Sequence, residues 1–583
     1  MTARTPAIAG HCCQPHPELA GRVQLRRVPQ GPRSGRAATP EPEWSGWPDL
    51  LVVGPIVTMD SARPEAGAMA VQGGRIRAMG TRDELDGLRG PGTELLELGD
   101  RVAMPGMVEP HMHLWTSVLF DAAVDCSPFT NRTLDDVVAR LRAAAARLAP
   151  GEWLIGQLFD PSLFPGQPDL TAEILDRVAP DHPVAVMNAS MHFLYVNSKA
   201  FELVGIDDQT PDPPGGVFQR RDGHLTGVVG EMAAETRIID AIPKLSHEDL
   251  VAGLRRIMNR AAAVGITKVH EAATGGVFGP VELDLLHHMQ ADQPLPVRVT
   301  AALLDQARAA WEQAGIEPGA GDDMVRAISR KIISDGSNQG YSGFLRDPYL
   351  GHEGRGAPNL TEAELVEAIG DAHRHGWQAM VHANGDAAID LVVAAFGTVL
   401  GDDRHDSGSP TDLRHRIEHC SLARPEHLEA MAALGLSPSF LMNHLYYWGR
   451  VFRDDIFGPE RAALLDPVAS ALRHGLRPSF HSDYSVSPLG GLRHVQTAVT
   501  RKMFDGGEVL NAAECVDVAT ALRGVTIDAA WQTHTDTQLG SLEVGKYADL
   551  AILSDDPHRV DPDEIASITV SETRLAGVTA WSS

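Results

Sequence analysis

Two histidines, His111 and His113, are the first residues of this 583-residue chain whose type and spacing suit metal chemistry. They end an apolar stretch, VAMPGMVEPHMHL (102–114), that has the character of a β-strand. On a strand, residues i and i+2 point to the same face, so both imidazoles could bind one divalent ion. Because such pairs are common, the interpretation depends on which residues end the other strands.

Reactive side chains also lie in or end other strand-like segments. They are Lys331 in AISRKIISD (327–335), His382 in AMVHANGD (379–386), His419 in HRIEHCSL (415–422) and Asp483 in RPSFHSDY (477–484). The carboxyl ends of parallel barrel strands meet at one face. Imidazole and carboxylate ligands without a thiolate are typical of zinc or a similar ion. The sequence therefore predicts a centre with one or two divalent ions, with zinc the expected metal.

Eight strand-like segments in all must position these residues. The other four are residues 102–114, 265–272, 297–304 and 436–445. Helical patterns, such as residues 361–375 and 425–434, separate the strands. Alternation of strand and helix over eight units predicts an α/β fold, a (β/α)8 TIM barrel over residues 105–535.

Three further segments lie outside this alternation. Residues 1–47 are rich in Arg and Pro and predict a disordered tail, whose HCCQPH motif (11–16) has no second Cys/His pair to complete a metal site. Residues 48–104 and 536–583 are each too small to bury a core, so we expect both chain ends to form one small β-sandwich domain. The segment of about residues 115–245 predicts an insertion after the first barrel strand, which would form a cap over the active site. Within it we expect a helix over 133–149, whose N-terminus Thr133 and Asp136 would stabilise as a capping box.

Composition excludes several classes of partner. The net charge of −27 argues against binding to nucleic acid or to an anionic membrane surface. The sequence contains no run of about 18 apolar residues, which is the length needed to span a membrane. The five cysteines are few and scattered, and the N-terminus has no secretory apolar region, so a reducing cytoplasm is the expected location.

At the level of motifs, the chain resembles the amidohydrolase superfamily, in the branch typified by N-substituted formamide deformylase and its YtcJ-like relatives. The resemblance runs from about residue 48 to 580 and is carried by PGMVEPHMH, GHLTGVVGEMA, KIISDGS, VHANGDAAID, RIEHCSL, SFHSDYSVSPL and LGSLEVGKYADLAIL. Two positions depart from it. Glu109 stands where many relatives have Asp, and HSDYS (481–485) stands where many have GSDWP.

The resemblance implies a role for each residue of the predicted centre. His111 and His113 would ligate the buried metal, and Asp483 would be both ligand and general base. His382 and His419 would ligate a second ion or complete a single site. Lys331 occupies the position of a carboxylated lysine that bridges two metals in many members, and a structural ion pair is the alternative.

Further candidates surround this set. His444, at the end of the seventh predicted strand, could stabilise an oxyanion or simply line the pocket. His481 could orient a metal ligand. Cap and loop residues that could contact the substrate, or equally serve packing alone, are His192, Glu231, Tyr447 and Trp448.

The expected activity is hydrolysis of an amide or formamide C–N bond by a metal-bound hydroxide. A divalent ion lowers the pKa of bound water to about 7, and Asp483 would pass the proton to the departing nitrogen. The same site could act on a cyclic amide, an ester or lactone, or as a deaminase. A third hypothesis is a barrel that has lost catalytic activity and serves only in binding or regulation. The presence of a suitable residue at every expected ligand position argues against it. The partner is then a small-molecule substrate, and a homodimer is expected only by analogy.

Overall fold

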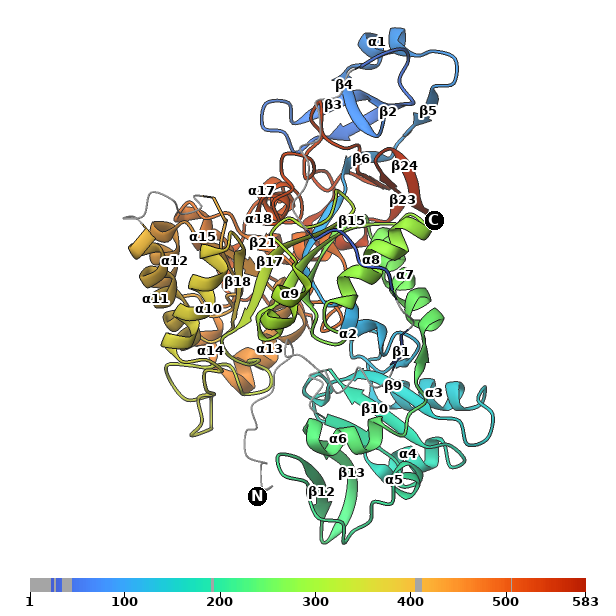
Figure 1. Cartoon of the computed structure of the whole chain (residues 1–583), viewed down its shortest axis with the longest axis vertical. Helices are drawn as coiled ribbons and strands as arrows, with labels where there is room; N and C mark the ends of the chain where they lie inside the picture. The colour runs from blue at the N-terminus through green and yellow to red at the C-terminus, as the bar shows by residue number, and fades with distance from the viewer. Residues whose placement is uncertain (1–22, 26–27, 34–43, 190–192, 404–411, 505) are drawn as a thin grey trace.

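The computed structural model describes residues 23–25, 28–33, 44–189, 193–403, 412–504 and 506–583. In Figure 1 an α/β barrel occupies the middle of the molecule, a β domain lies at the top of the view and a cap lies at the bottom. The predicted (β/α)8 architecture is confirmed.

Eight parallel strands form the barrel sheet and follow the order of the chain. They are β7 (Met107–Met112), β15 (Ile266–Thr274), β16 (Arg298–Leu304), β17 (Val325–Ile333), β18 (Gln378–Ala383), β19 (Arg416–His419), β20 (Ser437–Phe440) and β21 (Ser479–Phe480). The ring closes just beyond β21, where the backbone N–H of His113 donates to Tyr484 (2.6 Å) and that of Asp483 donates to His111 (3.2 Å). Closure therefore brings the first and last predicted ligand segments together.

The helix α10 (Glu362–Arg374) illustrates how helices pack around the barrel with one buried apolar face. In α10, Leu365, Ala368, Ile369 and Ala372 recur at helical spacing and are buried. The helices expected at 361–375 and 425–434 are α10 and α12 (Pro425–Leu434). The other principal helices are α7 (His247–Ala263), α8 (Val281–Asp292), α9 (Arg308–Ala314), α11 (Asp386–Asp403), α16 (Gly491–Thr500), α17 (Val518–Gly524) and α18 (Ile527–Gln532).

Segments from both chain ends share one sheet outside the barrel. Its strands are β2 (Leu50–Val57), β3 (Glu65–Gln72), β4 (Arg75–Gly80), β5 (Glu94–Glu97), β6 (Val102–Pro105), β22 (Leu550–Leu553), β23 (Val570–Leu575) and β24 (Val578–Ser582). The two ends meet where β6 pairs antiparallel with β22. The ladder runs through these strands as one continuous sheet, and alternate residues of β2 contribute to apolar clusters on its two faces.

The cap is a six-stranded sheet with its own apolar core, and it follows β7 in the chain. Its strands, in sheet order, are β12 (Val217–Arg221), β13 (His224–Gly230), β11 (Phe193–Val196), β10 (Val184–Asn188), β9 (Leu154–Phe159) and β8 (Val124–Asp125). Its helices are α3 (Leu134–Ala145), α4 (Ala172–Val178), α5 (Ser198–Val204) and α6 (Met232–Ile239). Trp448, beyond β20, joins the barrel to the cap by donating to the Asp160 carboxylate (3.0 Å).

Part of the segment that was expected to be disordered makes specific contacts. β1 (Val23–Gln24) pairs in parallel with β14 (Leu245–Ser246), and the Arg33 guanidinium forms an ion pair with Asp284 (3.0 Å). The HCCQPH motif lies outside the described residues. No helix in the described part of the chain is both long enough and apolar enough to cross a bilayer.

Loss of the predicted hydrogen bonds at the N-terminus of α3 should lower the stability of the cap domain modestly. The Thr133 hydroxyl accepts a hydrogen bond from the Asp136 backbone, and the Asp136 carboxylate accepts from the Thr133 backbone. We expect Thr133→Ala to lower the free energy of unfolding by about 1 kcal/mol, and Thr133→Ser to change it by only a few tenths. Urea unfolding of both variants measures this, and equal stability of the two would contradict the capping role.

Candidate metal centre

His111 and His113 lie at the mouth of the barrel and face the same carboxylate. β7 ends at Met112, and His113 is the first residue of the turn into α2 (Leu114–Val118). The Nε2 atoms of His111 and His113 lie 3.4 and 3.1 Å from Oδ1 of Asp483. The i, i+2 spacing therefore puts both imidazoles beside Asp483, as the barrel topology predicts.

Asp483 follows β21 in the left-handed region, with φ of 54°. Its side chain is almost fully buried, and neither carboxylate oxygen accepts a hydrogen bond of ordinary geometry from the described residues. Burial of a carboxylate without compensation is costly, and bound cations are a usual form of compensation. A cation held between Asp483 and the histidines fits this arrangement.

His419 and His382 complete the ring of imidazoles. The His419 ring centroid lies 4.9 Å from that of His111 and 4.4 Å from that of His382. Ligand atoms of His111, His419 and Asp483 come within 4.8 Å of one another, close enough to hold one ion. All of these side chains are buried.

Lys331 enters the centre from β17. Its side chain is fully buried, and Nζ lies 3.2 Å from Nε2 of His111. The structure thus places the Lys331 amine beside one of the predicted ligands, and both its carboxylation and its bridging role stay predictions.

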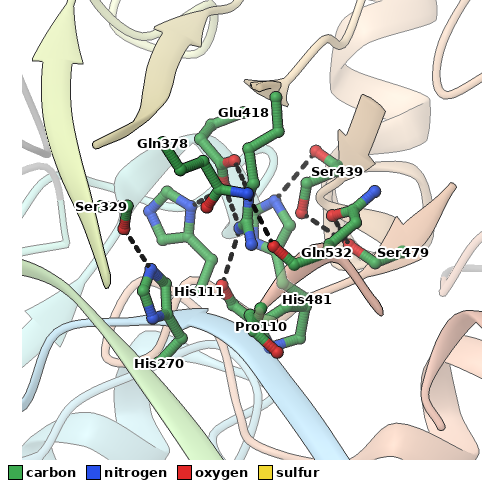
Figure 2. Close-up of polar contacts among 12 residues, drawn as sticks. Pro110, His111, His270, Ser329, Gln378, Glu418, Ser439, Ser479, His481 and Gln532 are labelled. Atoms are coloured by element: carbon green, nitrogen blue, oxygen red, sulfur yellow. Dashed lines mark hydrogen bonds and ion pairs between the residues drawn. The ribbon is translucent and has the colours of Figure 1, made fainter. Parts of the chain in front are cut away.

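A carboxylate that sequence reasoning missed fixes the orientation of His111. The Nδ1 atom of His111 lies 2.5 Å from Oε2 of Glu418 (Figure 2). Arg416 holds Glu418 through two hydrogen bonds. Arg416 also donates to the backbone oxygen of Pro110 (2.8 Å). A carboxylate on Nδ1 favours the tautomer that leaves Nε2 free to bind a metal. The sequence feature that could have indicated this role is the spacing of Arg416 and Glu418 in RIEH, because two residues two apart on a strand point to the same face.

Asp335 is a second residue that sequence reasoning left without a role. It lies two residues beyond the end of β17, in KIISDGS, and is fully buried. Its carboxylate accepts backbone N–H groups of Asn384 and Gly385, both at 2.9 Å, and lies 3.4 Å from Nε2 of His382. Asp335 therefore ties the end of the fourth barrel strand to the loop that follows His382.

Glu109, at the first departure from the family pattern, links the first and last barrel strands. It accepts hydrogen bonds from the hydroxyl (2.8 Å) and the backbone (3.1 Å) of Ser482. Burial raises the pKa of Glu109 to about 8. Glu109, whose side chain is longer than that of Asp, thus keeps a carboxyl group beside Asp483. The first and last barrel strands still meet around it.

His481 and His270 pack behind the ligand ring. The His481 ring stacks on His111 with centroids 4.6 Å apart, and its Nε2 contacts the backbone oxygen of Ser439 (3.3 Å; Figure 2). Burial lowers the pKa of His481 and of His270 well below the ordinary value. β21 ends at Phe480, so His481 lies just beyond the strand on which it was expected.

The prediction that His444 ends the seventh strand is wrong. β20 stops at Phe440, and His444 is the first residue of a π-helix, His444–Trp448. The apolar run LMNHL does not by itself distinguish a strand from a helical turn. The His444 ring still lies near the centre, with its centroid 6.5 Å from that of His419.

The remaining candidates are spread around the cap. Tyr447 packs on Phe129 with ring centroids 4.4 Å apart. Glu231 immediately precedes α6, with φ of 67°. His192 lies outside the described residues.

Two neighbouring cavities that share wall residues lie beside His113, between the barrel mouth and the cap. The smaller, of about 20 Å³, is lined by His113 and by cap residues such as Gln157. The larger, of about 270 Å³, is lined by Trp448 and by cap residues of β10 and β11. Both share Asn188, Ala189 and Val486 in their walls, so the 270 Å³ cavity adjoins the smaller one that His113 lines.

Comparison with known proteins agrees with this geometry. Residues 94–580 match a family described as the amidohydrolase family. The N-substituted formamide deformylase of Arthrobacter pascens is 30% identical over 547 residues, which cover 91% of this chain and 98% of that protein. YtcJ of Bacillus subtilis (strain 168), described as an amidohydrolase, is 28% identical over 534 residues, covering 90% and 97%. These relatives confirm the branch that the motifs indicated.

A solved structure shares the fold. That of a metal-dependent hydrolase from Pyrococcus horikoshii OT3 has a TM-score of 0.69 and 21% identity, and the match covers 88% of this chain and 99% of that one. Barrel, ligand ring and sequence match point to the same conclusion. The chain belongs to the amidohydrolase family.

Proposed function

We propose that the protein hydrolyses the C–N bond of a linear amide or formamide with the help of a bound divalent ion, zinc in the first instance. The observation that carries this is the buried Asp483 carboxylate beside the Nε2 atoms of His111 and His113. The choice of a formamide-like bond is supported by the deformylase relative, which this chain matches over nearly its whole length.

The donor set fits such an ion. Imidazole nitrogens and one carboxylate are the ligands that zinc takes in hydrolytic sites. His111, His113, His419 and Asp483 would hold the ion, with His382 and Lys331 available for a second. A divalent ion supplies a more acidic water and polarises the carbonyl oxygen.

The protein's own groups then move the proton. Asp483 lies where it can accept the proton of the attacking water and return it to the departing nitrogen, which leaves poorly as an unprotonated amide anion. Glu418 holds the Nδ1–H of His111, so that its Nε2 stays directed at the centre. His113 and cap residues such as Gln157 line one cavity, so the cap would help to shield a substrate bound there from bulk water.

Metal removal and return test the proposal. We expect chelator-treated protein to lose hydrolysis of a formamide and amide panel, and one or two equivalents of zinc to restore it, with metal content read by elemental analysis. The panel should include carbamates, esters and cyclic amides. Full activity of metal-free protein, or turnover of esters alone, would overturn the proposal.

A further inference from the structure

The cavity of about 270 Å³ that shares wall residues with the His113 cavity has two carboxylates in its own wall. Asp160 and Asp169 line it, together with Phe193, Tyr195 and Trp448. Among the described residues that line this cavity, none is Lys, Arg or His. The described part of the cavity wall is therefore acidic and aromatic at once.

Asp160 is held in a fixed orientation. Oδ2 accepts the indole N–H of Trp448 (3.0 Å), and Oδ1 accepts the backbone N–H (2.9 Å) and hydroxyl (2.6 Å) of Ser162. Trp448 is fully buried, and its ring lies 5.7 Å from that of His444. One wall of the cavity is thus built on the same π-helix that begins beside the metal ligands.

Asp169, an exposed residue, brings a second carboxylate to the wall. Within the described residues its side chain makes no hydrogen bond or ion pair, although the charge of Arg221 acts on it from outside the lining. Burial raises the pKa of the Tyr195 hydroxyl, and the charges of Asp169 and Asp160 raise it further. The negative potential of the two groups therefore converges on the cavity.

These walls suit an organic cation better than a metal ion. Among the described residues, no three ligating atoms gather here as closely as they do at the barrel mouth. Aromatic faces combined with carboxylates are the usual surroundings of ammonium groups, which gain cation–π and ion-pair contacts together. A carboxylate-bearing ligand would be repelled.

We propose that this cavity binds a positively charged substituent, an alkylammonium or a related cation, on the nitrogen side of the substrate. The inference rests on the proposed C–N hydrolysis and adds its substrate class. Asp160, Asp169 and Trp448 are then specificity residues, separate from the groups that move the proton.

Three formamides of matched length test this: N-(5-aminopentyl)formamide, N-hexylformamide and 6-formamidohexanoate, which are cationic, neutral and anionic. With zinc-loaded protein we expect kcat/KM to favour the cationic over the neutral compound by about tenfold, the size of one desolvated cation–π contact with an ion pair. Asp169→Asn should remove most of that preference, and Asp160→Asn/Asp169→Asn all of it. Asp169→Asn should lower kcat/KM for the cationic compound more than for the neutral one. Asp181→Asn, an exposed cap residue outside the lining, is the matched control.

Binding without turnover separates this inference from the proposed function. Calorimetric titration with pentyltrimethylammonium should give saturable binding to wild type and Asp181→Asn, and binding at least about fivefold weaker to Asp169→Asn. Binding of the cation without formamide turnover would sink the proposed reaction and leave the cation site standing. Equal use of the three formamides, or equal cation affinity in wild type and Asp169→Asn, would overturn the cation site.

Discussion

Asp483→Asn should lower kcat/KM by about a thousandfold on an amide that the wild-type protein hydrolyses. This is the middle of the range for loss of a positioned acid–base group. Asparagine has nearly the same shape, so the barrel closure through the backbone N–H of residue 483 and His111 should survive. Its amide can neither accept the water proton nor return it to nitrogen. Steady-state kinetics on zinc-loaded protein, with metal content measured on the same sample, checks the result.

The control is Asp292→Asn, an exposed carboxylate at the end of α8 that lies far from the site in sequence. It should keep metal content and turnover. Asp483→Asn with normal metal content and turnover within a fewfold of wild type would remove Asp483 from the proton transfer. Loss of metal together with activity would instead show that its ligand role dominates.

Sequence reasoning could locate the ligand ring because the topology leaves little choice. In a parallel barrel, the ends of strands that are far apart in the chain must meet at one face, and the chemistry of His111, His382, His419 and Asp483 identifies that face. The contacts of these residues in the structure follow from that argument, without detailed knowledge of packing.

The residues behind the ring could not be found in this way. Arg416 and Glu418 are ordinary charged residues in a strand, and only the packed barrel reveals that Glu418 meets His111, 307 positions away. The error at His444 has a different origin, since the chain turns into a helix immediately after a four-residue strand. A short apolar run carries too few periods to separate the two conformations.

Glu418→Gln should weaken both the metal site and the fold. We expect the zinc Kd to rise about tenfold, because an amide oxygen accepts the Nδ1–H of His111 more weakly than a carboxylate does. The free energy of unfolding of metal-free protein should fall by about 3–5 kcal/mol, because Arg416 is left as a buried cation without its counter-charge. Zinc competition titrations and denaturant unfolding measure the two effects separately.

A double variant distinguishes the two roles of Glu418. In Arg416→Met/Glu418→Gln the buried cation is gone, so most of the lost stability should return, while the weak acceptor on His111 remains and the zinc Kd should stay raised. Glu429→Gln, an exposed residue of α12, is the matched control and should change neither quantity. If zinc affinity recovers together with stability, Glu418 acts through the fold alone. If affinity stays low in the restabilised protein, Glu418 acts on the metal site through His111 itself.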